Sequence, residues 1–560
     1  MRKLYLFLAL LGAAPLFSQT LLTVPSTHLG IDSSRRILLV QLAEAALPTA
    51  LNGLSTDEDT YRFVTSPATL EYTSDYSVTG QAGDTFHLYF TPLPLVRIDP
   101  VTYLNQREKR RASFTYAAGD AVVESTIGIR HRGGFSLRFP KKSFDLEFRE
   151  SADREETRDV QFGSMREDDD WVIDALYNEP QRVNAYVAHK VWLDLHSLRY
   201  ADEEPEARAG ADLEFVEVFF DGQYYGLCTL GEQVDRKQLK LKNVKDGVVR
   251  GVLFKSGGYT EATRFQGVPS QDVKDDTWAG WEVKHPEPEE VDWDQLRSLI
   301  RFANTTDPDY FRAEAAARID LENMVDYALF VNALRLTDNI SKNVYLARYH
   351  AGSPYFFVPW DMDAGMGNKH DGTRIETPLG WSQNRLLARL IELSPAGFTD
   401  RLCSRLETLQ SGLLDPEALI GRVIEATTYL ERSGAYRREA IRWSNLNTSE
   451  EQSAYTSSVL RDQGTYLSEY VCSLSTSLRD AHGLASVPLR PYPNPTGDLA
   501  YVDLQGHSLP LAYRLLDRDG RILGTGQMTQ TPAALDLRGL PGGMYVVQIG
   551  QRAVRVVKAD

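Results

Sequence analysis

The chain has 560 residues, 42% of them hydrophobic, and a formal net charge of −16. This composition is that of a globular protein with enough apolar residues for two to four domains. The negative charge disfavours binding to a polyphosphate backbone, so we expect no nucleic-acid partner.

The first residues have the organisation of a secretory signal peptide. Arg2 and Lys3 precede an apolar run from Leu4 to Phe17. We expect residues 1–19 to be removed on export. The run is too short to span a membrane and no later run is long enough, so we predict no transmembrane segment after cleavage.

Three cysteines occur in the chain, Cys228, Cys403 and Cys472, and their spacing does not match a metal site. An odd number permits at most one disulfide, and a Cys403–Cys472 bridge is one possibility. The alternative that we favour is buried free thiols, because unpaired cysteine commonly packs as a small apolar side chain.

The first half of the chain is predicted to be rich in β-strands. Residues 20–94 contain short β-like runs such as Phe86 to Phe90, separated by turn residues. Further strands are expected at Ser125–Arg130 and Ser143–Arg149, on either side of a basic turn. A hairpin is predicted from Leu213–Phe220 and Tyr224–Leu230, joined by an Asp-Gly turn.

Two adjacent lysines, Lys141 and Lys142, open the strand at Ser143–Arg149. Strand alternation places Lys142 on the apolar face of Phe144 and Phe148, and Lys141 on the other face. A buried ammonium needs a counter-charge, which nucleotide phosphates supply. Lys142 is therefore the better nucleotide-binding candidate and Lys141 the reserve, while solvated charges on an edge strand are the alternative.

Two further residues near strand ends are weaker nucleotide-site candidates. Glu232 follows an apolar strand and is a possible partner of the lysine or a ligand of a second ion. A surface glutamate at a strand end explains it equally well. Lys255, after another apolar run, is a second phosphate candidate.

The sequence becomes helical in character after Asp292, although one helix is already expected at Arg182–Leu195. Asp320 is predicted to cap one of these later helices. The helices predicted in this part of the chain are Val291–Ala303, Asp307–Arg318, Asp320–Leu334, Asn384–Leu393, Pro416–Arg432 and Glu451–Asp480.

Residues 336–363 contain the densest cluster of chemically capable side chains. The spacing from Asp338 to Asn343 equals that of the protein-kinase catalytic loop H-R-D-x-x-x-x-N. There the Asp orients and deprotonates the attacking hydroxyl, and the Asn holds magnesium. The alternatives are a capping or turn Asp and a turn Asn that opens a strand.

A predicted hairpin brings a second acidic loop to the same place. Its strands are Val344–Arg348 and Tyr355–Val358, so the loops before and after them open at one end. Asp361 and Asp363 follow, and on an extended segment they share a face. Oxygen ligands of this kind suit Mg²⁺, although a structural calcium loop is the alternative.

A cluster of prolines at residues 487–495 marks the clearest domain boundary, because clustered prolines cannot continue a helix. We predict that residues 486–560 form a small, sandwich-like, all-β module with turns at Asp519-Gly520 and Pro541-Gly543. Its predicted strands are Ala500–Leu504, Ala512–Asp517, Arg521–Met528 and Met544–Ile549.

Residues from about 95 to 480 resemble the spore coat protein H (CotH) kinase family. The segments that carry the resemblance are Arg132 to Phe144, Asp170-Trp171, Val216 to Glu232, Asp338 to Asn343 and Pro359 to Asp363. The resemblance implies an α+β, atypical protein-kinase-like bilobal fold over residues 95–485, with a β-rich first lobe and a helical second lobe. It also implies ATP and Mg²⁺ (or Mn²⁺) as cofactors, with Asp361 as the principal metal ligand.

The tail resembles a type A sorting domain of the type IX secretion system. The matching stretches are Tyr492 to Pro495, Leu516 to Gly520 and Leu540 to Val547. The resemblance implies that residues 486–560 engage the type IX secretion machinery. It further implies secretion or display on the outer-membrane surface of a Gram-negative bacterium of the Bacteroidota.

These observations lead to one functional hypothesis and two alternatives. The leading one is a secreted kinase that transfers the ATP γ-phosphate to a hydroxyl of an unidentified protein, with Asp338 catalytic, Asn343, Asp361 and Asp363 at the metal, and Lys142 at the phosphates. The first alternative is a non-catalytic cell-surface binding or adhesion protein on a kinase-like scaffold with a structural metal. The second is transfer of the nucleotide instead of the phosphate.

Overall fold

The structure is a computed structural model. It describes residues 20–43, 47, 51–100, 103–151, 156–375, 383–480, 489, 491–504, 509–517, 521–549 and 552–559. The predicted signal peptide, residues 1–19, and the predicted turn at Asp519-Gly520 lie outside the described residues.

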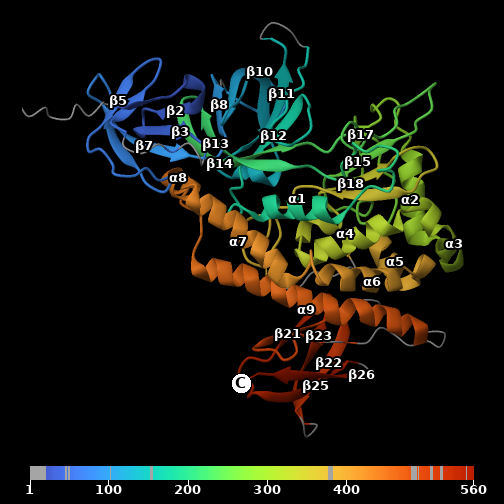
Figure 1. Cartoon of the computed structure of the whole chain (residues 1–560). Coiled ribbons are helices and arrows are strands. Elements are labelled where there is room, and N and C mark those ends of the chain that lie inside the picture. Colours follow the sequence, from blue (N-terminus) through green and yellow to red (C-terminus); the bar gives the residue numbers. More distant parts are fainter. Residues whose placement is uncertain are drawn as a thin grey trace, which may run out of the picture.

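A sheet of short strands forms the N-terminal part of the molecule (Figure 1). Its order is β1-β4-β5-β6-β7-β3-β2, and β3 runs parallel to β7. Exposed and buried residues alternate at the start of β7. This pattern is typical of a strand that packs one face on the core and exposes the other face to solvent. The strands are β1 Leu21–Thr23, β2 Leu29–Asp32, β3 Ile37–Gln41, β4 Gly53–Ser55, β5 Thr60–Phe63, β6 Tyr76–Thr79 and β7 Thr85–Thr91.

A closed barrel follows, in the order β10-β11-β12-β14-β13-β8-β9. Its interior is filled with aromatic and branched side chains such as Phe114, Phe148 and Trp171, all at most 1% exposed. The predicted Leu213–Phe220 hairpin is present. The strands are β8 Leu95–Asp99, β9 Arg110–Ala118, β10 Ala121–Arg132, β11 Ser143–Arg149, β12 Asp170–Asp174, β13 Leu213–Phe220 and β14 Gln223–Glu232.

A second sheet, ordered β16-β17-β15-β18-β19, carries the predicted acidic loops. Val344 pairs with Pro359 in the β18–β19 hairpin, so the residues before β18 and after β19 lie at one end, as predicted. The strands are β15 Val252–Ser256, β16 Thr277–Trp278, β17 Trp281–His285, β18 Val344–Arg348 and β19 Tyr355–Pro359.

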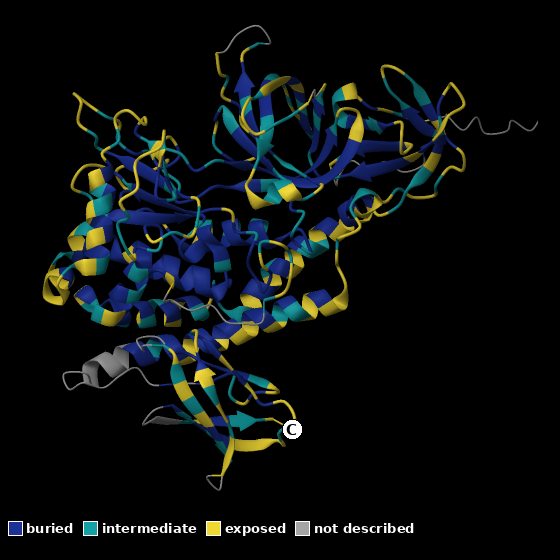
Figure 2. Cartoon of the chain, turned by 180° about the vertical axis from the view of Figure 1, so that it is seen from behind, coloured by how far each residue is buried: buried dark blue, intermediate teal, exposed yellow. Residues whose placement is uncertain are grey.

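Helices pack beside this sheet and bury its apolar residues (Figures 1 and 2). Asp320 caps α4 by accepting a hydrogen bond from the Asn323 amide, which confirms the predicted helix start. The helices are α1 Asn184–Leu195, α2 Trp293–Thr305, α3 Pro308–Arg318, α4 Leu321–Ala333, α5 Arg385–Leu393, α6 Phe398–Gln410, α7 Pro416–Arg432, α8 Ala435–Arg442 and α9 Glu450–Asp480. The chain is thus of the predicted α+β class.

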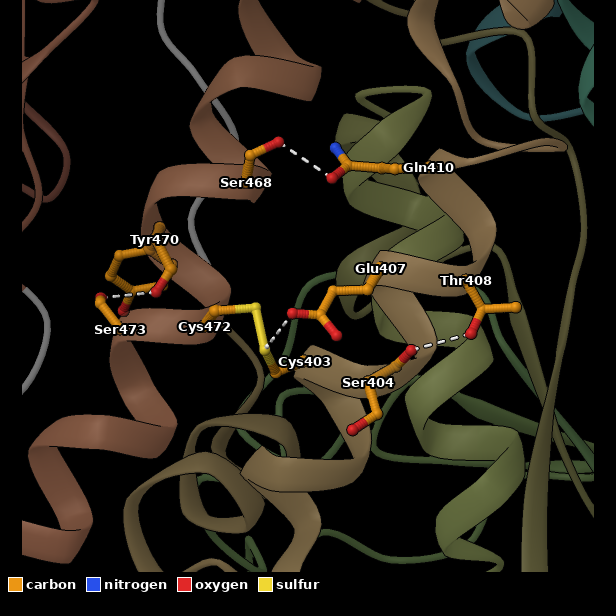
Figure 3. Close-up of a disulfide and its surroundings, with 9 residues drawn as sticks. All are labelled: Cys403, Ser404, Glu407, Thr408, Gln410, Ser468, Tyr470, Cys472 and Ser473. Carbon is orange, nitrogen blue, oxygen red and sulfur yellow. Dashed lines mark hydrogen bonds between the residues drawn. A yellow bond between two sulfur atoms is a disulfide. The ribbon is translucent and has the colours of Figure 1, made fainter.

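A disulfide joins Cys403 of α6 to Cys472 of α9 (Figure 3). The expectation of free thiols is therefore wrong for this pair and holds for Cys228, which is buried and unpaired. The two helices pack closely enough to bring the Cα atoms within 4.7 Å. Sequence reasoning did not predict helix α6, and without it the partners could not be placed together.

The C-terminal module is all-β and lies against α9 (Figure 1). It has a sheet ordered β20-β21-β24 and a second ordered β23-β22-β25-β26. No helix among the described residues is long and apolar enough to cross a membrane. The strands are β20 Pro491–Tyr492, β21 Leu499–Val502, β22 Leu511–Asp517, β23 Ile522–Met528, β24 Ala533–Asp536, β25 Gly543–Ile549 and β26 Arg552–Lys558.

Candidate functional site

The two predicted loops are joined by the side chain of Asn339. Its amide nitrogen donates to the carbonyl oxygens of Asn343, at 2.9 Å, and of Trp360, at 2.7 Å. The Trp360 amide in turn donates to the Asn343 carbonyl at 3.0 Å. These bonds continue the β18–β19 ladder, so Asp338, Asn343 and Asp361 come from adjoining segments.

Asn343 and Asp361 both have left-handed backbone conformations, with φ of 53° and 54°. Such a conformation is uncommon for a residue with a side chain, although Asn and Asp adopt it more readily than most. Strain of this kind collects at ligand-binding and catalytic positions, where the surrounding structure enforces it. Two of the three residues predicted to bind metal thus share this unusual feature.

Asp338 is buried in the short 3₁₀ helix η4, Thr337–Ile340, which follows α4. One carboxylate oxygen lies 2.8 Å from Lys342 Nζ, and the other accepts from the Tyr259 hydroxyl at 3.1 Å. Burial and the Asp338 charge raise the pKa of Tyr259, so this phenol stays protonated as a donor. Asp338 is therefore held in one orientation by two partners.

Asp361 and Asp363 form an electrostatically unfavourable pair. Burial and then the nearby Asp174 raise the pKa of Asp361. Burial and then Asp361 raise the pKa of Asp363 well above its usual value, although the Asn178 amide donates to Asp363 at 2.6 Å. A nearby cation stabilises the ionised form of an acidic group, and it does so most where burial and like charge have raised the pKa.

The oxygen donors of Asn343, Asp361 and Asp363 suit a hard divalent cation that is also bound by water or substrate. Asp361 and Asp363 supply carboxylate oxygens and Asn343 an amide oxygen, as Mg²⁺ prefers. Within the described residues, neither carboxylate belongs to a group of three acidic, His or Cys ligands that converge within 4.8 Å. Mg²⁺ is commonly bound by one or two carboxylates together with substrate phosphates and water, and these residues fit that pattern.

A pocket opens between the barrel and the β18–β19 loops. The barrel contributes Arg132, Lys141 and Asp174, and the loop after β19 contributes Asp361 and Asp363. The rest of the wall includes Gly133, Ser136, Phe139, Tyr177, Asn178, Glu179, His189 and Trp360. Of the predicted residues, Lys141, Asp361 and Asp363 line this pocket. Asn343, bonded to Asp361, and Lys255, beside Trp360, lie next to it.

Two cations flank the Trp360 ring beside the acidic pair. The Arg132 guanidinium lies 5.2 Å from the ring centroid and Lys255 Nζ 5.7 Å from it. Burial and then the charge of Arg132 lower the pKa of Lys255 to about 8. In the part of the chain that the structure describes, no carboxylate lies within ion-pair distance of Lys255. The charge of Asp361 acts on both cations, and Arg132 also donates to Asp174, so Lys255 is the less compensated cation of the two. A buried cation of this kind favours a nearby anion.

Arg132 and Asp174 were not predicted as site residues. Arg132 is the last residue of β10, and Asp174 is the last residue of β12. The Arg132 guanidinium donates to the Asp174 carboxylate at 3.3 Å. Both strands lie beside β11, and both residues line the pocket with Asp361 because the barrel lies against the loop after β19. The sequence signal for Arg132 was its place in the Arg-Gly-Gly turn.

A sequence model described as CotH kinase protein matches residues 129–472. The chain belongs to the CotH kinase protein family. A second model, described as a secretion system C-terminal sorting domain, matches residues 490–559. A search of curated proteins finds no match. The first match includes Arg132 at the end of β10, the other pocket residues and both cysteines of the disulfide, and the second covers the C-terminal β module.

The buried lysine of this CotH protein is Lys141, so the prediction that Lys142 points to the buried side is wrong. The side chain of Lys141 is fully buried and its Nζ lies 2.9 and 3.0 Å from the Glu439 carboxylate oxygens. Lys142 is half-buried, and its Nζ donates to the carbonyl oxygens of Leu137 and Phe139. The strand begins only at Ser143, after a 3₁₀ turn, so strand alternation does not extend back to the lysines.

Glu232 lies outside the pocket of the CotH region. It is 2% exposed, so the alternative of a surface glutamate is wrong. It is also not the partner of either lysine, because Lys141 pairs with Glu439 and Lys142 bonds carbonyl groups. Its carboxylate accepts from the backbone amides of Arg166, at 2.7 Å, and Asp212, at 2.9 Å. It also accepts from the Gln238 side chain at 2.9 Å. Glu232 therefore joins the end of β14 to two neighbouring loops.

Proposed function

We propose that this protein is a secreted or surface-displayed kinase that transfers the γ-phosphate of ATP to a protein hydroxyl. The barrel is the first lobe of the proposed kinase and the helical half is the second. The sorting-domain match supports export by the type IX machinery, and we place the protein at the surface of a Gram-negative bacterium of the Bacteroidota.

The observation that carries this proposal is the opposition of charges around Trp360. Lys255 is a buried cation with a lowered pKa, and Asp361 and Asp363 are buried carboxylates whose pKa values stay raised although Arg132, Lys255 and Lys342 act on Asp361. A magnesium-bound polyphosphate matches both, because its cation meets the acids and its oxygens meet Arg132 and Lys255.

Each residue then has one role. Asn343 and Asp361 hold Mg²⁺ or Mn²⁺, and Asp363 lies beside them to orient the ion. When bound, the cation neutralises charge on the phosphates. Lys255 and Arg132 contact the phosphates, a role that replaces the one expected of Lys142, whose ammonium already donates to two carbonyl groups.

Asp338 positions the acceptor hydroxyl and accepts its proton. Lys342 and Tyr259 hold the carboxylate in place. Lys342 also lies close enough to influence Asp361, so it links the proposed base to the metal-binding residues.

A direct test uses the purified mature protein with ATP labelled at the γ- or the α-phosphate, in the presence of Mg²⁺ or Mn²⁺. Asp338→Ala and Asp361→Ala are expected to reduce transfer of γ-label by at least about 100-fold, the usual scale for acid–base and metal groups. Asp309→Ala is the matched control, because that carboxylate is 92% exposed on α3 and lies apart from the pocket.

The outcomes separate the candidate activities. If the α-label is transferred and the γ-label is not, the activity is nucleotidylation and not phosphorylation. Absence of both transfer and ATP binding in the wild type would overturn the kinase proposal and favour the non-catalytic scaffold.

A further inference from the structure

The sorting module packs on the CotH domain through buried aromatic and polar side chains. The Tyr466 hydroxyl of α9 donates to the Asp503 carboxylate of the module at 3.0 Å. The ring centroids of Tyr466 and Tyr492 are 4.4 Å apart. Tyr492 and Tyr501 of the module are 5% and 7% exposed and belong to the same apolar cluster as α9. The junction is therefore a packed interface (Figure 1).

Arg335 of the CotH domain lies at this interface. It is 5% exposed, and its Nε and one terminal nitrogen have no hydrogen-bond partner. Burial lowers the pKa of Arg335, and Tyr455 of α9 together with Tyr501 and Tyr492 of the module act against this shift. A buried guanidinium with unused donors is costly, so contact with water would stabilise Arg335 relative to its buried state.

The backbone of Arg335 connects the interface to the proposed catalytic loop. Arg335 has a left-handed φ of 52° and stands between α4 and the 3₁₀ helix that carries Asp338. The neighbouring Leu334 carbonyl accepts from the Met366 amide at 2.7 Å, and the Thr337 amide donates to the Ala364 carbonyl at 3.1 Å. The segment is thus bonded to the chain that follows Asp361 and Asp363.

We propose that the sorting module is an intramolecular ligand of the CotH domain, which covers Arg335 and restrains the segment from Leu334 to Asp338. The surface that it recognises consists of Arg335 and the tyrosine face of α9, and the module offers a carboxylate, Asp503, and two tyrosine rings. This inference concerns an interaction within the chain and does not rest on the proposed kinase activity.

The interface also contains groups whose burial is unfavourable and which therefore favour release of the module. The Tyr492 hydroxyl is buried without a hydrogen-bond partner, as are two nitrogens of Arg335. Each such group is less stable when buried in this way than when it is hydrated. Undocking returns these groups to water. The favourable free energy of their hydration offsets part of the free energy that is lost when the apolar contacts separate. Departure of the module therefore exposes a cationic, aromatic surface and frees the Arg335 segment.

Chemical modification of Arg335 tests the docking in the full chain. Phenylglyoxal modifies exposed arginines, and peptide mass spectrometry follows each site. Tyr466→Phe removes the hydrogen bond to Asp503 and keeps the ring, so Arg335 is expected to react about three to ten times faster, the fold-change for one lost hydrogen bond. Tyr103→Phe is the matched control, because Tyr103 is 86% exposed.

Hydrogen exchange supplies the second readout. Peptides that contain residues 334–338 are expected to exchange faster in Tyr466→Phe, while peptides from the barrel interior, such as those of β11, keep the wild-type rate. Asp503→Ala removes this acceptor together with the acceptor of the Thr531 hydroxyl, so the double variant should be no faster than Asp503→Ala alone. Equal modification of Arg335 in all variants, or strictly additive effects of the two substitutions, would overturn the proposal.

Discussion

Lys141 and Glu439, which are 298 residues apart, form a fully buried ion pair between the entrance of β11 and helix α8. The same carboxylate accepts from Arg182 at 3.1 Å and from the Leu227 amide at 2.8 Å. The pair therefore joins the barrel to the helical half at the edge of the pocket. A buried ion pair stabilises only while both partners are present, since removing one leaves an uncompensated charge.

We accordingly expect Lys141→Met to lower the free energy of unfolding by about 3–5 kcal/mol. Urea denaturation followed by circular dichroism measures this loss. Lys142→Met is the matched control, because its ammonium meets carbonyl groups at a half-exposed position, and its cost should be at most about 1.5 kcal/mol. Equal costs for the two variants would show that the Lys141–Glu439 pair has no special structural role.

This pair also shows where sequence reasoning reaches its limit. Asp338, Asn343 and Asp361 could be placed together because one hairpin determines their positions, and strand pairing is a local property. The lysines could not be assigned, because a 3₁₀ turn ends just before them and alternation fails outside a strand. Arg132 and Asp174 meet Asp361 only because the barrel lies against the loop after β19, and no local pattern encodes that contact.

The disulfide provides a prediction about stability in an oxidising environment. Cys403 and Cys472 are 69 residues apart, and a cross-link of that span restricts the unfolded chain. We expect a Cys403→Ser, Cys472→Ser variant to lose about 3–4 kcal/mol in urea denaturation. A reducing agent should lower the stability of the wild type to that of the variant and leave the variant unchanged.

Cys228 serves as an internal control for this experiment. Burial raises the pKa of its thiol to about 12. Iodoacetamide should therefore fail to label the native, oxidised protein and should label a single cysteine once it is unfolded without reductant. Labelling of three cysteines under those conditions would contradict the disulfide.

Neutralising Asp361 should stabilise the metal-free protein. The pKa of Asp361 is raised above 3.8, so the folded protein retains a proton that the unfolded chain releases, and stability falls as pH rises above that value. Asp361→Asn removes this penalty and should raise Tm at pH 7 by about 1–4 °C. The same variant should lose the rise in Tm that Mg²⁺ or Mn²⁺ produces in the wild type.

Asp371→Asn is the control for the Asp361 measurement, because Asp371 is exposed and bonded to Thr373, so its metal response should be that of the wild type. A wild-type response to metal in Asp361→Asn would remove Asp361 from the proposed ligand set.

The lowered pKa of Lys255 predicts how nucleotide binding depends on pH. With a pKa of about 8, its ammonium is charged below that pH and neutral above it. A phosphate group binds the charged form, so ATP affinity should fall as pH rises through about 8 and lose up to about tenfold per pH unit beyond it. Isothermal titration calorimetry between pH 7 and about 9.5 measures the profile.

Two substitutions separate this effect from other titrations. Lys255→Met should bind ATP weakly at every pH, with a flat profile, whereas Lys255→Arg should keep affinity above pH 8, because a guanidinium stays charged there. The folded pKa lies below the ordinary 10.5, so stability of the ligand-free wild type should rise between about pH 8 and 10.5 as the folded protein releases the proton first. A wild-type affinity that does not change through pH 8, together with an unaltered profile in Lys255→Met, would place the phosphates away from Lys255.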